Sequence, residues 1–182
     1  MEAAESEIAH IEGQGALSFL AIDDVSLADE GEVIDPHSVA QLPFDEGGPR
    51  FPQIVADTGD EFLRMLNRSG KTWTIIVDAH NEPRLALRVD DFIREALFSP
   101  HVFNPRRHCH RPIVVRNAER KLGDLIQSFQ VRPERPGDDI VDDDVILLWD
   151  NERRIVTGTD ILGRLLRGIA SRQAKKERFT SE

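Results

Sequence analysis

The chain repeats itself over its last two thirds, and this repeat limits the possible folds more than any other feature. A short apolar run that begins with proline occurs at 52–55 and again at 112–115, 60 positions later. Each run is followed by apolar residues at i, i+3 and i+4, which are Phe62, Met65 and Leu66 in the first copy and Leu122, Leu125 and Ile126 in the second. This spacing predicts that each copy begins with a strand and continues with an amphipathic helix.

The rest of each copy predicts a hairpin and a second helix. Continuous apolar strands are expected at 74–78 and 146–150, and each is followed by a polar turn and a shorter strand, at 85–87 and 155–156. The helix stripes that follow lie 69 positions apart. The order is therefore strand, helix, strand, strand, helix, twice. A unit of about 45 residues cannot cover both faces of its sheet, whereas two units packed together can.

The change of offset from 60 to 69 places a net insertion of nine residues in the second copy. It falls near 131–144, a segment that contains two prolines, a glycine and five aspartates. That composition predicts a loop.

The first 50 residues are strongly acidic. They hold twelve of the 33 acidic side chains and only one of the 23 basic ones, while the remainder is nearly neutral. Residues 28–50, which contain three prolines, suit a linker or an irregular wrap over a neighbouring surface. The net charge of −10 disfavours binding to nucleic acid.

The cysteine content and the hydropathy of the chain indicate in which cellular compartment the protein is expected. The single cysteine, Cys109, excludes an intramolecular disulfide, and a reducing, cytoplasmic location is the simplest expectation. The longest apolar stretch, at 16–22, is far shorter than the roughly 20 residues that a membrane-spanning helix needs. No membrane association is expected.

The order of elements, together with the hydrophobic–x–Thr–x–x–Asp pattern from Ile155 to Asp160, resembles the CBS domain family. This family is named after cystathionine β-synthase, and its members usually occur as tandem pairs called Bateman modules. The resemblance implies an α/β fold in which two pseudo-symmetric βαββα units pack together, with an acidic irregular N-terminal arm, and it implies a homodimer. The predicted ranges are 1–50 for the arm, 51–98 for the first unit, 99–110 for a basic linker, 111–170 for the second unit and 171–182 for the tail.

The resemblance also implies a ligand, an adenosine-containing nucleotide such as AMP, ADP or ATP. The positions that the family would assign to it are Thr58, Trp73, Arg88 and Asp91 in the first unit, and Asn117, Val145, Thr157 and Asp160 in the second. A carboxylate such as that of Asp160 can accept hydrogen bonds from both ribose hydroxyls. It can equally be an ordinary carboxylate at a helix N-terminus. Trp73 can stack on a base or simply close the sheet.

Two positions depart from the family pattern. Arg154 stands where the family often has glycine, and Arg88 stands where the second unit has Thr157. An arginine at position 88 could clamp a phosphate, because its guanidinium suits oxyanions. These departures leave open which ligand binds and whether one or two sites are live.

Three other groups carry chemistry-bearing residues. The stretch from Arg106 to Arg111, which includes His108, Cys109 and His110, could bind phosphate or form a polar connector, and it lacks the four spaced ligands of a zinc site. A Cys109 nucleophile with a neighbouring histidine base is a weaker alternative, because partners in a catalytic triad are seldom adjacent in sequence. The aspartates at 138–144 could gather a hard cation or form a solvated loop.

The motifs of common enzyme classes are absent from the sequence, so no catalytic residue, no metal and no required cofactor is predicted. The leading hypothesis is a stand-alone regulatory protein that senses an adenosine-containing nucleotide and signals to a separate protein partner. The alternative is a ligand-free assembly or scaffold protein that uses the fold for dimerisation and protein contacts. A metal-dependent hydrolase built on the aspartate-rich loop is a remote third.

Overall fold

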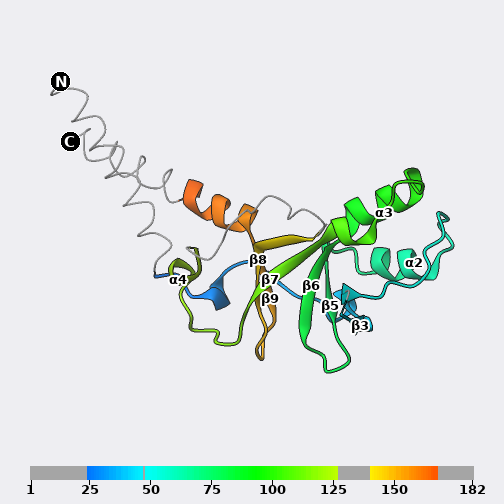
Figure 1. The fold of residues 1–182 in the computed structure, drawn as a ribbon. Coiled ribbons are helices and arrows are strands. Elements are labelled where there is room, and N and C mark those ends of the chain that lie inside the picture. The colour runs from blue at the N-terminus through cyan, green and yellow to red at the C-terminus, as the bar shows by residue number, and fades with distance from the viewer. Residues whose placement is uncertain (1–23, 47, 127–139, 168–182) are drawn as a thin grey trace, which may run out of the picture.

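A seven-stranded mixed sheet runs through the protein, in a computed structural model that describes residues 24–46, 48–126 and 140–167 (Figure 1). Its strands lie in the order β1-β9-β8-β7-β6-β5-β2. They are β1 (Glu32–Val33), β2 (Val39–Gln41), β5 (Trp73–Val77), β6 (Pro83–Arg88), β7 (Cys109–Val115), β8 (Val141–Leu148) and β9 (Arg154–Thr157). A separate small hairpin joins β3 (Phe44–Asp45) to β4 (Gly48–Pro49).

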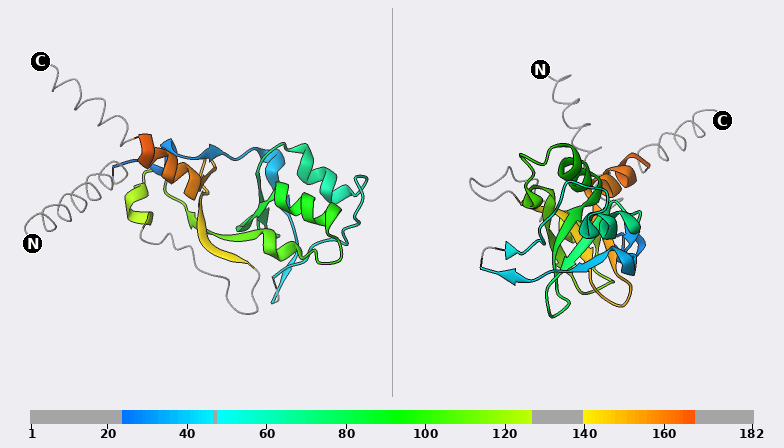
Figure 2. Two further views of the ribbon diagram at one scale, coloured as in Figure 1. Left: turned by 90° about the horizontal axis from the view of Figure 1, so that it is seen from above. Right: turned by 90° about the vertical axis from the view of Figure 1, so that its right-hand side faces the viewer.

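The helices gather at the two ends of the molecule. They are α2 (Glu61–Arg68), α3 (Val89–Phe98) and α4 (Leu122–Ile126), a further helix at 158–167, and the 3₁₀ turns η1 (Leu27–Asp29), η2 (Pro36–Ser38) and η3 (Pro105–His108). Figure 2 shows α2 and α3 at one end, with α4 and the helix at 158–167 at the other. Each predicted helix stripe therefore lies on a helix.

The strand pairing repeats in the two halves of the sheet. In the first half, β2 runs parallel to β5, β5 pairs with β6 in antiparallel fashion, and α3 follows. In the second half, β7 runs parallel to β8, β8 pairs with β9 in antiparallel fashion, and the helix at 158–167 follows. The α/β fold of two βαββα units is confirmed.

The first strand of the first unit is not where the sequence predicted it. Residues 52–55 form no strand, so that prediction is wrong, and β2 takes the place beside β5 with Val39 opposite Ile75. Ile54 instead packs from a loop against the apolar core of the first unit, and the N–H of Val55 donates to the Asp60 carboxylate. We therefore propose that the first unit begins near residue 39.

The two units share one apolar layer. Alternate side chains of β5 and β8 point to opposite faces, as in any strand, so that Ile76 and Ile146 each enter the core of their own unit. Their neighbours Ile75 and Val145 meet on the other face in a third cluster, which draws residues from both units. Both faces of β5 and of residues 145–148 of β8 are therefore buried, which explains why the sequence there is apolar without a break.

The described part of the acidic arm crosses both units. Val25 and Leu27 are buried in the core of the second unit, β1 pairs with β9, and β2 then pairs with β5 of the first unit. Arg154 fixes this path, because its guanidinium donates to the carbonyl oxygens of Glu30 (3.2 Å) and Gly31 (3.3 Å). Arg154 thus holds the arm onto β9, and residues 28–50 wrap over the two units instead of forming a linker.

The predicted loop at 131–144 is shorter than expected at its C-terminal end. Strand β8 begins at Val141, so 141–144 belong to the sheet, whereas 131–139 lie outside the described residues. Within the described ranges, no helix has the length and apolarity that crossing a bilayer requires.

Candidate functional site

The turn from β9 into the helix at 158–167 contains Thr157 and Asp160. One carboxylate oxygen of Asp160, Oδ2, accepts hydrogen bonds from both the backbone N–H and the hydroxyl of Thr157, each at 2.8 Å. The bond from the backbone N–H is the reciprocal contact of a capping box, in which the third helical residue reaches back to the residue before the helix. The other oxygen, Oδ1, makes no hydrogen bond to any described residue, so half of this carboxylate remains open to a ligand.

The equivalent turn of the first unit is closed by ion pairs. The guanidinium of Arg88 lies 2.9 Å from Asp91 Oδ2, and Arg94 donates to Asp91 Oδ1. Both oxygens of Asp91 are therefore occupied by arginines of its own helix and N-cap. Arg88, which stands at the position of Thr157 in the second unit, thus pairs with the carboxylate that was predicted to bind a ribose.

Trp73 and Val145 lie on the strands next to these two turns, each opposite the residue that begins the turn. Trp73 faces Arg88 across β5 and β6, and Val145 faces Thr157 across β8 and β9, so the structure brings each pair together. The side chain of Val145 is 1% exposed and packs in the shared cluster. The ring of Trp73 meets the His110 ring edge to face at 4.9 Å, so it packs at the junction of the units.

Thr58 and Asn117 lie away from these turns. Asn117 follows β7, whose end at Val115 pairs with Leu148. Leu148 is three residues along β8 from Val145, about 10 Å at strand spacing. Thr58 is exposed in the loop that precedes α2. The structure therefore separates Asn117 from Thr157, and a ligand role for Thr58 or Asn117 stays a prediction.

The two histidines of the stretch from Arg106 to Arg111 contact different carboxylates. His108 Nε2 lies 2.6 Å from a carboxylate oxygen of Glu95 on α3, and His110 Nδ1 lies 2.8 Å from Asp144 on β8. Cys109 between them is fully buried. Within the described residues, no three His, Cys, Asp or Glu side chains are grouped as a metal site would require.

Cys109 is expected to be unreactive in the folded protein. Burial raises the pKa of its thiol to about 12, and the positive charge of Arg106 only partly opposes this. Since the thiolate is the nucleophile, alkylation by iodoacetamide at pH 8 should be at least about tenfold slower in native protein than in urea-unfolded protein. Mass spectrometry of timed samples measures both rates, and equal rates would show that the thiol is accessible.

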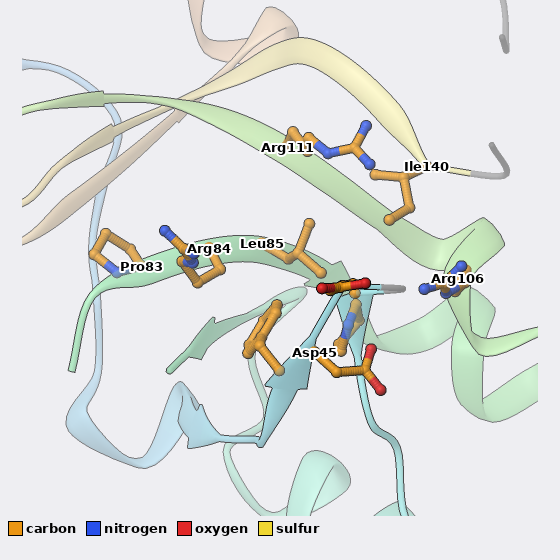
Figure 3. Close-up of a pocket in the computed structure, with 11 residues that line it drawn as sticks. Asp45, Pro83, Arg84, Leu85, Arg106, Arg111 and Ile140 are labelled. Carbon is orange, nitrogen blue, oxygen red and sulfur yellow. The ribbon is translucent and has the colours of Figure 1, made fainter. Parts of the chain in front are cut away.

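An open cavity of about 580 Å³ lies where the units meet (Figure 3). Its lining comes from the β3–β4 hairpin, the start of β6, η3 and the first residues of β7 and β8. Three arginines line it, which are Arg84, Arg106 and Arg111, together with two acids, Asp45 and Glu46. None of the eight positions predicted to bind a nucleotide lines this cavity.

Only part of this cavity could be predicted from the sequence. The run that contains Arg106 and Arg111 was a candidate for phosphate binding from its charge alone. Arg84 and Phe44 gave no signal, because β6 and the β3–β4 hairpin meet the connector only through long-range packing. A further arginine beside a turn proline, as in Pro83-Arg84, is too common a pattern to indicate a site.

Comparisons with known proteins find only structural likenesses. No protein-family model matches the chain, and no curated protein matches it. A CBS-domain pair with bound AMP from Klebsiella pneumoniae is 17% identical at a TM-score of 0.41, over 78% of this chain and 98% of that one. The CBS domain of a CBS-domain-containing membrane protein from Sphaerobacter thermophilus is 13% identical at a TM-score of 0.42, over 86% and 96%.

A third structure, a functionally unknown conserved protein domain from Neisseria meningitidis, is 14% identical at a TM-score of 0.42, over 77% of this chain and 78% of that one. The similarity of this protein to CBS-domain pairs rests on the order and pairing of its own strands and helices.

Proposed function

We propose that this protein is a regulatory module that binds an adenosine-containing nucleotide at the turn of its second unit and signals to a separate protein partner. The observation that carries the proposal is the half-open carboxylate of Asp160, whose Oδ1 is available while Oδ2 is fixed by Thr157. A fixed carboxylate with one open oxygen can accept a ribose hydroxyl. The N-terminal amides of the helix beside it favour a phosphate.

The contrast between the units supports a single live site. Asp91 has arginines on both of its oxygens, whereas Asp160 has no basic partner in the described part of the chain. A ribose at Asp91 would have to displace Arg88 or Arg94. A ribose at Asp160 would displace nothing.

A second candidate function, the ligand-free scaffold, is favoured by the helix at 158–167. Leu162 and Leu166 lie one turn apart on this helix and are 55% and 57% exposed. Two exposed leucines at i and i+4 form an apolar stripe of the kind that binds another helix or protein surface. On this reading the contact between Thr157 and Asp160 is only a helix cap.

Substitution of Asp160 by alanine distinguishes the two functions. In the wild-type protein, AMP at one hundred times its dissociation constant should raise Tm by roughly 5 °C or more. Asp160→Ala should abolish that rise. Separately, it should lower the stability of the ligand-free protein by about 1 kcal/mol, because it removes the helix cap. Differential scanning fluorimetry with and without AMP measures both effects.

Asp91→Ala is the matched control, since it removes the equivalent carboxylate of the first unit. The control should keep the full response to AMP. A wild-type protein that shows no rise with AMP, ADP or ATP would contradict the sensor and favour the scaffold.

A further inference from the structure

The cavity between the units combines two kinds of lining. The three arginines and two acids give it a formal charge of +1. Its remaining side chains are mostly apolar and come from both units: Phe44, Pro49, Pro83, Leu85 and Ile140. A volume of about 580 Å³ is within the range of small-molecule sites. Arginines beside an apolar wall suit a small anion that carries an apolar body.

Arg106 is the side chain best placed to receive an anion. Its guanidinium makes no ion pair with any described residue. It lies against the backbone of Gly48, where a Cβ would stand 2.5 Å from its Nη2 atom. Because glycine has no side chain there, the guanidinium can lie against the hairpin, and Arg106 lines the cavity (Figure 3).

Arg84 adds a second positive charge from strand β6 of the first unit. Its only described acidic contact is loose, with Nε 3.5 Å from Asp78 Oδ2, and its guanidinium lies 5.9 Å from the centre of the Phe44 ring. The side chain is 55% exposed, so it can turn toward a ligand at little cost. Guanidinium groups suit phosphate oxygens, which they bind through paired hydrogen bonds.

The two acids oppose an anion unequally. The Asp45 carboxylate is engaged by Arg50, with 2.6 Å between Arg50 Nε and Asp45 Oδ2. Glu46 is exposed, and no ion pair forms between it and another described residue. Glu46 is therefore the main source of repulsion for an anion in the cavity.

We propose that this cavity is a second binding site, which takes a small phosphate monoester with its phosphate on Arg106 and its apolar body against Phe44 and Leu85, while Arg84 adds attraction from the other side of the cavity. The site goes beyond the nucleotide site proposed above, because the two share no residue. It uses the linker at 99–110 and strand β6 of the first unit.

Phenyl phosphate is the probe, titrated by calorimetry into the full-length protein at constant ionic strength. The wild-type protein should bind it saturably, and phenol, which lacks the phosphate, should not bind. Arg106→Gln should weaken binding at least tenfold, and Arg84→Gln, which removes a more distant charge, should weaken it by a smaller factor. Arg68→Gln removes the same charge from the exposed end of α2, which does not line the cavity, and should leave binding unchanged.

A substitution that should raise the affinity for phenyl phosphate makes the test stricter. Glu46→Gln removes repulsion and should tighten phenyl phosphate binding by severalfold, while Asp160→Ala should leave it unchanged. Binding that is lost in Asp160→Ala but retained in Arg106→Gln would overturn the second site and leave the nucleotide site standing. Absence of saturable binding to the wild-type protein, or equal affinity in Arg106→Gln and Arg68→Gln, would overturn it as well.

Discussion

Replacing Phe92 by alanine is expected to lower the free energy of unfolding by about 3–5 kcal/mol. The ring is fully buried at the centre of the first unit's core. It contacts four other rings, with centroid distances of 5.8 Å to Phe51, 5.9 Å to Phe62, 5.0 Å to Phe103 and 5.7 Å to His108. Its loss leaves a cavity that these rings cannot fill without leaving their own contacts. Urea unfolding followed by circular dichroism measures the change.

Phe98 on the same helix provides the matched control. It is 81% exposed, so Phe98→Ala should change stability by less than about 0.5 kcal/mol. Similar losses for the two variants would mean that Phe92 is not at the centre of the core. The order of elements in the first unit would then need revision.

Replacing Gly31 by alanine is expected to cost between about 2 and 5 kcal/mol. Its φ of +67° carries a penalty of about 1–2 kcal/mol for a residue with a side chain. A Cβ at Gly31 would also stand 2.1 Å from the carbonyl oxygen of Ile155 on β9, so one of the two backbones must move, at about 1–3 kcal/mol more. Thermal or urea unfolding measures the loss.

Gly70 allows the cost of the positive φ to be separated from the cost of the clash with β9. Its φ of +61° is similar, but no atom lies within 4 Å of a Cβ built there. Gly70→Ala should therefore cost only about 1–2 kcal/mol. If Gly31→Ala costs no more than Gly70→Ala, the arm does not cross β9 as described.

The long apolar segments could be predicted from the sequence, and the short ones could not. The hairpin and the two helices between 61 and 98 could be predicted because each carries its own hydrophobic pattern over several residues. Strand β2 has three residues and β1 has two, which is too few for a pattern to show. Their place depends on pairing with strands 36 and more than 100 positions away, which local sequence does not encode.

The candidate site could be predicted only in part, for a related reason. The spacing of Thr157 and Asp160 is local, and the expected turn is present. The separation of Asn117 from that turn depends on the register of β7 against β8, which places Val115 opposite Leu148. The Asp91 carboxylate forms ion pairs with both Arg88 and Arg94. The pair with Arg94 could have been predicted, because residues at i and i+3 of a helix are neighbours.

The most direct test of the central claim, that Asp160 holds a nucleotide, is a titration of the ¹⁵N-labelled protein with AMP followed by amide NMR. Saturable shifts are expected at the amides of residues 157–160, and no such shifts are expected in Asp160→Ala. Spectra that stay unchanged at millimolar AMP, or shifts at 157–160 that persist in Asp160→Ala, would contradict it.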